Sequence, residues 1–438
     1  MSNEFDKILI SYKQADFEGQ IEQLRSKIML AAVFDPEGGQ IRQLRDIVYN
    51  VARRRDEAVA EYTEKFDGVK LACEQFRVKR EDLKKAHTEI DGELLASLRQ
   101  AIENVRKYQK EIFVGKSKNC SNGTGIKYTP VKRVGICVPG ASAPLPSTVI
   151  MTAVPAQVAG VKEIAAISPP RYKGSVHPVI LAVCYELGID EVYRIGGSHA
   201  VAALAFGTRT IPKVDKIVGP GNQWVQMAKK EVFGQVDIDS IAGPSEVLII
   251  ANDAANPAWV AADMLSQAEH APGSAVVFTD SAHLAEKVLS ELAKQVNQLD
   301  RAQETIECLK KFGGIVVFKN MDDVIKRAND FAAEHLEIQC GDKSKKIASK
   351  IDNAGAVFIG EYSPVAVGDY WAGPSHTLPT GMSAKFFSAL SANDFVKSTS
   401  IIEYDKAKLA ESADNIIRLA ETEGLDAHAG SIRIRQQQ

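Results

Sequence analysis

The sequence of 438 residues lacks the hallmarks of several large protein classes. No segment approaches the roughly 18 consecutive apolar residues that indicate a membrane-spanning helix. The first ten residues, MSNEFDKILI, contain no basic stretch followed by an apolar one, so we expect no secretory signal. The formal net charge is −3 and no basic patch stands out, so we expect no nucleic-acid partner. These absences favour a soluble chain with neither a membrane nor a nucleic acid as partner.

Cysteine is scarce and scattered. The six cysteines, at positions 73, 120, 137, 184, 308 and 340, form no CxxC pair. Their spacing argues against a disulfide framework and against a cysteine zinc site, and it is typical of proteins in a reducing compartment. We therefore expect a cytoplasmic location.

The order of apolar runs and turns predicts an α/β fold. Short apolar strands alternate with helices between residues 133 and 232 and again between 247 and 359, with glycine at many turns. Such alternation is typical of βαβ units on a parallel sheet. Helical periodicity extends from Asp35-Pro36 to about Gln109, and a strand-like run at 400–403 precedes a helix at about 406–421. We predict two Rossmann-like parallel-sheet domains of similar design, a helical N-terminal section and a small C-terminal extension.

One predicted helix ends in two potential metal ligands. Asn256 and Pro257 are typical of a helix start, as N-cap and first helical residue. Gln267 and His270 lie three residues apart, which places them on one helix face, and Pro272-Gly273 ends the helix. An amide oxygen and an imidazole could both bind a metal ion. A pair with this spacing is more often an ordinary surface pair.

Two glycine loops follow predicted strands and precede predicted helices. They are VPGASA at 138–143 and GPGN at 219–222, at the position where α/β sheets bind ligands. Neither loop matches GxGxxG, and no acidic residue stands where the dinucleotide-binding fingerprint requires one. Tight turns alone would explain the loops equally well. A dinucleotide would have to bind in a non-standard manner.

Candidates for proton transfer lie further along the chain. Glu334 and His335 come at the end of a predicted helix that begins near Asp322. A carboxylate beside an imidazole offers two proton acceptors, which suits a reaction with two proton transfers. A histidine that contacts the terminal carbonyl groups of its helix is the plainer alternative.

Two further segments contain polar residues of interest. The irregular run 362–376 contains Asp369 and His376 and follows a strand, although an aspartate next to glycine is often turn chemistry. In EGLDAH, near the C-terminus, His428 would be solvent-exposed unless it met a partner surface.

In combination, these motifs resemble the histidinol dehydrogenase family. The chain carries RVGICVPG, ALAFGT, KVDKIVGPGN, IDSIAGPSEVLIIA, SQAEH, AAEHLEI, SPVAVGDYWAGPSHTLPT and EGLDAH in the family's order, and the resemblance covers about residues 39–435. It implies a two-step, NAD-dependent oxidation of L-histidinol to L-histidine through a bound aldehyde, in histidine biosynthesis. It also implies one zinc ion per active site.

The resemblance assigns roles to individual residues. The implied zinc ligands are Gln267, His270, Asp369 and His428. Such a set of two nitrogen and two oxygen ligands suits zinc. His335 resembles the base that removes the hydroxyl proton, and Glu334 the base that activates water on the aldehyde. The implied substrate-binding residues are Ser245, Gln267, His270, His335, Asp369, His376, Glu423 and His428.

The resemblance further implies a cofactor site and a dimer. Cys137, His199 and Asn222 match positions associated with NAD, although the family often has tyrosine and glutamine at the first two. The family's C-terminal segment reaches the active site of the other subunit, which implies an obligate homodimer with shared active sites.

These inferences divide the chain into four parts. We expect an N-terminal arm, a first α/β domain on the zinc and substrate side, a second on the nucleotide side, and a dimerisation segment. Their ranges are 1–30, 31–132 plus 245–386, 133–244, and 387–438, respectively.

Three alternatives remain open. Relatives of the family act on other primary alcohols, including sulfonated diols, and the departures at Cys137 and His199 would suit such a paralogue. Glu423, His428 and His376 favour histidinol. A zinc hydrolase would use Glu334 to activate water without a redox cofactor, and the two sets of strands and helices with glycine loops speak against it. A non-catalytic relative would have no need of the complete ligand and base set.

Overall fold

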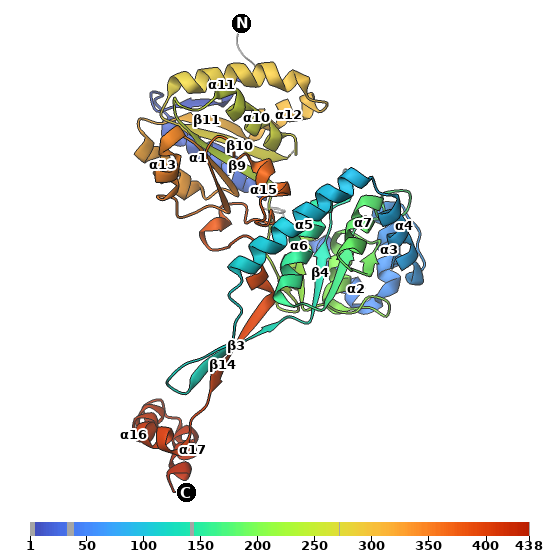
Figure 1. Ribbon diagram of the computed structural model, residues 1–438, viewed down its shortest axis with the longest axis vertical. Helices are drawn as coiled ribbons and strands as arrows, with labels where there is room; N and C mark the ends of the chain where they lie inside the picture. Colours follow the sequence, from blue (N-terminus) through green and yellow to red (C-terminus); the bar gives the residue numbers. More distant parts are fainter. Residues whose placement is uncertain (1–4, 33–38, 141–143, 271, 438) are drawn as a thin grey trace. The chain divides into compact units, whose positions relative to one another are not determined.

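The computed structural model describes residues 5–32, 39–140, 144–270 and 272–437. The chain forms two compact units (Figure 1). The larger unit comprises residues 1–113 and 131–395, and the smaller one residues 114–130 and 396–438. The larger unit contains two parallel sheets covered by helices, which confirms the predicted α/β class with parallel sheets. The predicted glycine loop at 138–143 extends beyond the described residues at its last three positions.

One sheet of the larger unit has six strands within the described residues, in the order β1-β11-β10-β9-β12-β13. All neighbouring strands are parallel. Apolar residues on both faces of its inner strands form two hydrophobic clusters, one beneath α10–α12 and one beneath α1 and α13. The strands are β1 (Leu9–Ser11), β9 (Ser245–Ala251), β10 (Gly273–Thr279), β11 (Gly313–Val317), β12 (His335–Gln339) and β13 (Ala356–Ile359). The helices are α1 (Phe17–Ala32), α10 (Pro257–Ala268), α11 (Ala282–Gln295), α12 (Ala302–Phe312), α13 (Met321–Phe331), α14 (Ser344–Ala348) and α15 (Val365–Tyr370).

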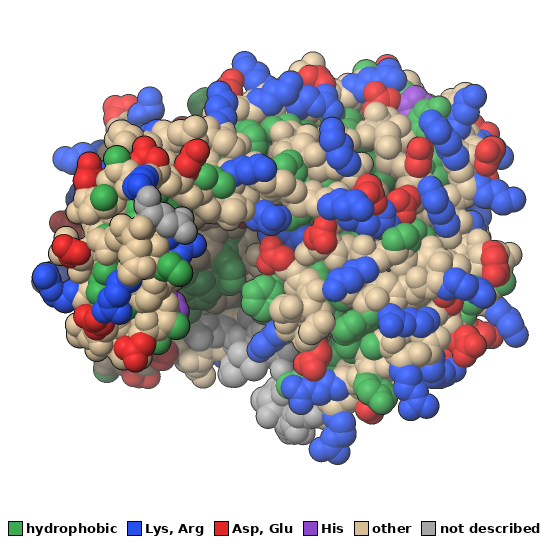
Figure 2. Space-filling model, turned by 90° about the horizontal axis from the view of Figure 1, so that it is seen from below, with side chains coloured by type: hydrophobic (Ala, Val, Ile, Leu, Met, Phe, Trp, Pro, Cys, Tyr) green, Lys and Arg blue, Asp and Glu red, His purple; other side chains and the backbone are tan. Residues whose placement is uncertain are grey.

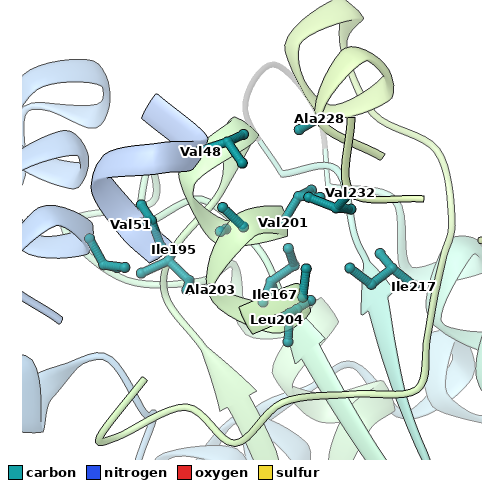
Figure 3. Close-up of a cluster of buried hydrophobic side chains, with 14 of the residues drawn as sticks. Val48, Val51, Ile167, Ile195, Val201, Ala203, Leu204, Ile217, Ala228 and Val232 are labelled. Carbon is teal, nitrogen blue, oxygen red and sulfur yellow. The ribbon is translucent and has the colours of Figure 1, made fainter. Parts of the chain in front are cut away.

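The other sheet has five parallel strands within the described residues, in the order β6-β5-β4-β7-β8. One hydrophobic cluster joins α2, α3, α8 and α9 to the strands (Figure 3). The strands are β4 (Arg133–Cys137), β5 (Glu163–Ile167), β6 (Glu191–Tyr193), β7 (Lys216–Val218) and β8 (Asp237–Ile238). The helices are α2 (Gly39–Arg54), α3 (Asp56–Asp67), α4 (Arg80–Glu89), α5 (Gly92–Ile112), α6 (Pro146–Ala159), α7 (Pro178–Glu186), α8 (Gly197–Phe206) and α9 (Gln223–Val232).

The grouping of segments differs from the predicted division of the chain. Helices α2–α5 pack on α6–α9 of the five-stranded sheet, whereas the prediction grouped 31–132 with 245–386. The physical reason is the apolar face of α2, whose Val48 and Val51 join the cluster formed by α8 and α9. Within the segment predicted as an N-terminal arm, 1–30, β1 pairs with β11 at the edge of the six-stranded sheet.

The smaller unit is a ribbon followed by two helices. β14 (Val396–Ile402) pairs antiparallel with β3 (Thr124–Pro130), which also pairs with β2 (Lys118–Asn119). The helices α16 (Lys406–Thr422) and α17 (Asp426–Gln436) pack on each other. The C-terminal part of the smaller unit therefore begins at 396 rather than at the predicted 387. The unit also includes 114–130, because β3 in this segment pairs with β14.

Two surface observations bear on the expected partners. Among the described residues, no helix is long and apolar enough to cross a membrane. On the molecular face shown in Figure 2, basic and acidic side chains are interspersed rather than separated into patches of one sign.

Candidate active site

A cavity of about 240 Å³ in the larger unit gathers residues from distant parts of the sequence. The predicted site residues that line it are Ser245, His270, Glu334, His335, Asp369 and His376. Ser245 and His335 are the first residues of β9 and β12, so this cavity lies at the amino edge of the six-stranded sheet. Ligands of open α/β sheets usually bind at the carboxyl edge, so strand order alone would not locate this site.

Glu334 and His335 lie at the start of a strand rather than at the end of a helix. Helix α13 ends at Phe331, and Ala332 adopts the left-handed conformation with φ 48°. β12 then begins at His335. The predicted helix end was wrong because the residue that stops the helix is alanine, whereas this conformation favours glycine.

The His335 imidazole is buried and held on one side by the backbone. Its Nδ1 lies 3.0 Å from the carbonyl oxygen of Glu246. A carbonyl oxygen only accepts hydrogen bonds, so in the neutral ring Nδ1 carries the hydrogen and Nε2 keeps its lone pair. Nε2 is buried, has no hydrogen-bond partner in the described structure, and lies 3.7 Å from Oδ1 of Asp369. This ring is oriented to accept a proton at Nε2.

Charges near His335 oppose the effect of burial on its pKa. Burial lowers its pKa, but the carboxylates of Glu334 and Asp369 raise it more strongly, to about 9. This pKa applies while Asp369 carries no cation.

The Glu334 carboxylate is held by two donors. Ser245 Oγ donates to its Oε2 at 2.6 Å, and the backbone N–H of Glu246 donates to the same oxygen at 2.8 Å. Burial raises the pKa of Glu334, while His335 and these hydrogen bonds act in the opposite direction. The carboxyl group is therefore fixed beside the imidazole with its affinity for a proton increased.

The four predicted metal ligands are distributed over both units. Gln267 is buried on α10, and its Nε2 has no partner in the described structure. The helix ends at Ala268, so His270 lies beyond the helix instead of sharing its face with Gln267. Asp369 lies on the short helix α15, in a segment that we predicted to be irregular. His428 belongs to α17 of the smaller unit, as Glu423 does to the turn before it.

In the part of the chain that the structure describes, no group of three or more His, Cys, Asp or Glu side chains is arranged to hold a metal ion. The larger unit contains three of the predicted ligands, and only His270 and Asp369 among them are of these residue types. Gln267, an amide, is the third predicted ligand in that unit.

A second cavity, of about 440 Å³, lies at the carboxyl edge of the five-stranded sheet. Its lining includes Cys137 at the end of β4 and Asn222 before α9. Pro220 and His270 also line the cavity around His335, so the two cavities share part of their walls. Burial raises the pKa of the Cys137 thiol to about 12, so it remains a neutral wall residue. Asn222 also caps α9 through its side chain, which is a structural role.

His199 lines a third cavity, of about 300 Å³, which shares Asn222 and Gly197 with the second. Its ring lies near those of Tyr62 and Phe66, and burial lowers its pKa to about 3, so the ring is neutral. Nε2 lies 3.2 Å from Thr63 Oγ1, whereas the buried Nδ1 has no partner in the described structure.

Sequence reasoning missed a buried ion pair that fixes the loop between the first two cavities. Lys229 on α9 pairs with Asp239. Lys229 Nζ donates to the carbonyl oxygen of Gly219 at 3.1 Å, and the N–H of Gly219 donates to Asp239 at 2.6 Å. Gly219 has φ +105°, and a Cβ there would meet the carbonyl oxygen of Cys137 at 2.5 Å. No sequence signal pointed to the pair, because its members are ten residues apart in an ordinary charge pattern.

Glu246 was also missed, although it belongs to the AGPSE motif. It is buried, accepts the N–H of Gly381 at 2.9 Å, and its pKa is raised by burial to about 8. The sequence did contain a signal for it, because a glutamate directly precedes an apolar run that predicts a buried strand.

Comparisons with known proteins agree on one family. The family model described as histidinol dehydrogenase matches residues 37–436. The chain is 45% identical to a histidinol dehydrogenase of Rhodopirellula baltica over 421 residues, which are 95% of this chain and 91% of that one. It is 47% identical to one from Caldanaerobacter subterraneus subsp. tengcongensis, over 90% of this chain and 92% of that one. A crystal structure of histidinol dehydrogenase from Elizabethkingia anophelis has a TM-score of 0.89 at 32% identity and covers 98% of both chains.

Proposed function

Because the chain belongs to the histidinol dehydrogenase family, we propose that the cavity around His335 binds L-histidinol and carries out both of its oxidations. The family makes this chain an NAD-using oxidoreductase of histidine biosynthesis. The observation that carries the residue assignment is the cavity itself, which gathers Ser245 from β9, Glu334 and His335 from the start of β12, and Asp369 from α15. In this proposal His335 and Glu334 act as the two bases, as the family resemblance implies.

In the first oxidation, His335 acts as the base. Its Nδ1 is occupied by the Glu246 carbonyl oxygen, so Nε2 faces the cavity as the proton acceptor. Nε2 takes the hydroxyl proton as hydride leaves the carbon; bound NAD would supply the hydride acceptor. A fixed ring suits this role, because a positioned base contributes roughly 10²–10⁴-fold to the rate.

In the second oxidation, Glu334 activates water on the aldehyde. Its carboxylate lies beside His335, and its Oε2 is anchored by Ser245 and by the Glu246 N–H. Burial raises its proton affinity, which suits a carboxylate that must take a proton from water. The hydrate then gives up its one C–H hydrogen as hydride, for which a second NAD would be the acceptor, and the proton of one hydroxyl group can pass to His335.

Zinc fits the donor set that we assign to it. Gln267 supplies the amide oxygen of a buried side chain, and His270 and Asp369 line one cavity. We propose that these three residues and a His428 hold the ion. A bound zinc ion would anchor nitrogen atoms of the substrate and polarise the groups attached to it. The proton transfers remain with His335 and Glu334.

We assign NAD to the second and third cavities. Cys137 and Asn222 line the second cavity, and His199 and Asn222 the third. The shared residue Asn222 suits one extended ligand that occupies both spaces. Because the second cavity also shares walls with the one around His335, a nicotinamide ring at that end would lie next to the substrate.

A homodimer with shared active sites is supported by the smaller unit. Among its described residues, the buried apolar side chains are the alanines 413, 420 and 429, whereas Ile402, Leu419 and Ile434 are 76%, 67% and 58% exposed. A unit with so little core of its own needs another surface to cover its apolar side chains. We propose that a second copy of this chain provides it, and that His428 and Glu423 thereby enter a partner's active site. The six cysteines are free, in keeping with a cytoplasmic location, which remains a prediction.

One assay tests the activity. Purified protein, zinc, NAD and L-histidinol should yield two molecules of reduced cofactor for each substrate molecule, because both oxidations transfer a hydride. Reduction with another primary alcohol but none with histidinol would move the assignment to a paralogue. No reduction with any alcohol would overturn the dehydrogenase assignment for this chain.

A further inference from the structure

One face of β12 is polar although the strand is buried. His335, Glu337 and Gln339 alternate with Leu336 and Ile338, and all five residues are buried. The two apolar residues join the core beneath α13, whereas the polar ones face α10 and α15. Buried polar groups on a strand are costly unless they are bonded, so this polar face requires an explanation. The proposed function uses only His335.

Glu337 and Gln339 connect three elements that carry proposed active-site residues. Gln339 Nε2 donates to Asp263 on α10 at 2.7 Å and to Glu337 at 3.0 Å. The other carboxylate oxygen of Glu337 accepts the backbone N–H of Val365, the first residue of α15, at 2.8 Å. Asp263 lies one turn before Gln267, and Val365 one turn before Asp369. The cluster thus joins α10, β12 and α15.

The surroundings of the two carboxyl groups in the cluster favour their protonated forms. Burial raises the pKa of Asp263 and of Glu337, the latter to about 8, and their proximity raises that of Glu337 further. Two carboxylates withdrawn from water and bridged by one amide do not both stay ionised. Glu337 therefore keeps its proton near neutral pH, and hydrogen bonds join the members of the cluster.

Helix α15 depends on such external contacts. It has six residues, too few for a helix to be stable by itself, and its N-cap residue Pro364 offers no side-chain hydrogen bond. Glu337 holds its first N–H, and Asn104 donates to the carbonyl oxygen of Trp371 just after its end at 2.9 Å. Asp369 lies between these two anchors.

We propose that the cluster of Asp263, Glu337 and Gln339 is a positioning device that fixes α15, so that Asp369 is presented to the metal and to His335. This inference rests on the proposed role of Asp369 as a zinc ligand. None of the three residues lines the cavity, so they act through Asp369 rather than on the substrate. Residues that orient a metal ligand from behind typically change metal affinity by about 10–100-fold.

The first test measures zinc affinity of the metal-free protein by competition with a chromogenic chelator. Glu337→Met removes the acceptor for the Val365 N–H at similar volume, and we expect it to weaken zinc binding by about 10–100-fold. Glu337→Gln keeps an oxygen for Val365 and has an amide N–H in place of the carboxyl proton of Glu337. We expect it to bind zinc within about threefold of the wild-type chain, because the hydrogen bond from the Val365 N–H is preserved and only the one from Gln339 Nε2 loses its acceptor. Equal affinities of Glu337→Met and wild type would overturn the proposal.

The second test breaks the same hydrogen bond from its other end. Val365→Pro removes the N–H, and proline is tolerated at the first helical position; Pro364 is already extended, with ψ 161°, as a residue before proline requires. Val365→Ala is the matched control, since it removes more of the buried side chain but keeps the N–H. We expect the proline variant to lose zinc affinity and the alanine variant to retain it. Combined with Glu337→Met, the proline change should add little, because both remove one bond.

Asp369→Asn separates failure of this inference from failure of the proposed function. If Asp369→Asn leaves zinc affinity unchanged, the ligand assignment is at fault. If it weakens binding while Glu337→Met and Val365→Pro do not, the ligand assignment stands and the positioning role is refuted. Circular dichroism of each variant verifies that the fold is retained. If Glu337→Met does not fold, the comparison of Val365→Pro with Val365→Ala tests the positioning role.

Discussion

The Nδ1 atom of His335 lies 3.0 Å from the carbonyl oxygen of Glu246 on the neighbouring strand. β9 and β12 are paired in parallel, with His335 opposite Val247, so the backbone of one strand sets the orientation of the ring on the other. This contact fixes the tautomer without the use of a side chain. The charge around the ring is controlled by the carboxylates of Glu334 and Asp369, which raise its pKa.

Glu334→Gln should separate the two oxidations. The amide cannot take a proton from water, so oxidation of the supplied aldehyde should slow by about 10²–10³-fold. The alcohol step, which uses His335, should slow by less than about tenfold, because an amide oxygen can still accept from Ser245. Single-turnover rates with the alcohol and with the aldehyde measure the two steps. Equal losses in both would contradict the division of labour.

Ser245→Ala should shift the pH dependence of the aldehyde step. The hydrogen bond from Ser245 lowers the pKa of Glu334 and so opposes the effect of burial. Without the hydroxyl the pKa rises further, and the ionised form that acts as base appears only at higher pH. The acidic limb of the rate profile should therefore move to higher pH. Ser245→Thr keeps the hydroxyl and is the control; an unmoved limb in the alanine variant would refute the effect.

Local sequence pattern was sufficient for most of the βα units but not for β12. The strand HLEIQ alternates polar and apolar residues, which is the signature of a half-buried strand, yet it lies inside the sheet. Its polar residues are buried because α10 and α15 supply partners for them, and these partners lie 28 or more residues away in the sequence. Hydrogen bonds between residues so far apart in the sequence cannot be predicted from a window of a few residues.

The predicted site residues came from motifs, and the structure adds what surrounds them. No motif indicated that α2 would pack on α8, because an amphipathic helix has an apolar face for any partner. Asp369 was predicted within an irregular segment, since VAVGDY contains a glycine and few helix formers. That glycine is required by packing, because a Cβ at Gly368 would meet the ring of Phe358 at 2.6 Å.

His199→Leu should weaken NAD binding while the chemistry is preserved. The ring is neutral and buried, with Nδ1 unpaired beside the third cavity, so it is available to bond a cofactor group. Loss of that bond should raise KM for NAD by about tenfold, which corresponds to roughly 1.4 kcal/mol. KM for histidinol and kcat should change little. Thr63→Val, which removes only the partner of Nε2, is the control; a loss confined to kcat would contradict the assignment.

Glu186 should contribute to stability in a pH-dependent way. Arg99 and His87 donate to its carboxylate and connect α5 and α4 to α7, and these contacts lower its pKa from 4.5 to about 2. A lowered folded-state pKa means stability that is present above about pH 4.5 and is lost as the pH falls towards about 2. The melting temperature of Glu186→Gln should therefore lie below that of the wild-type chain at about pH 7, with a smaller gap at about pH 3. A gap independent of pH would contradict this.

His270→Ala and His428→Asn should each lose zinc and activity, because each removes a proposed ligand. A mixture of the two variants tests whether an active site combines chains. If His270 comes from one subunit and His428 from its partner, each mixed dimer contains one site with both histidines intact and one with neither. Random reassortment makes half of the dimers mixed, so activity should recover to about a quarter of the wild-type value after subunit exchange. Zinc content should rise in parallel. If both histidines act within one chain, no mixture restores an intact site, and activity should stay at the level of the separate variants.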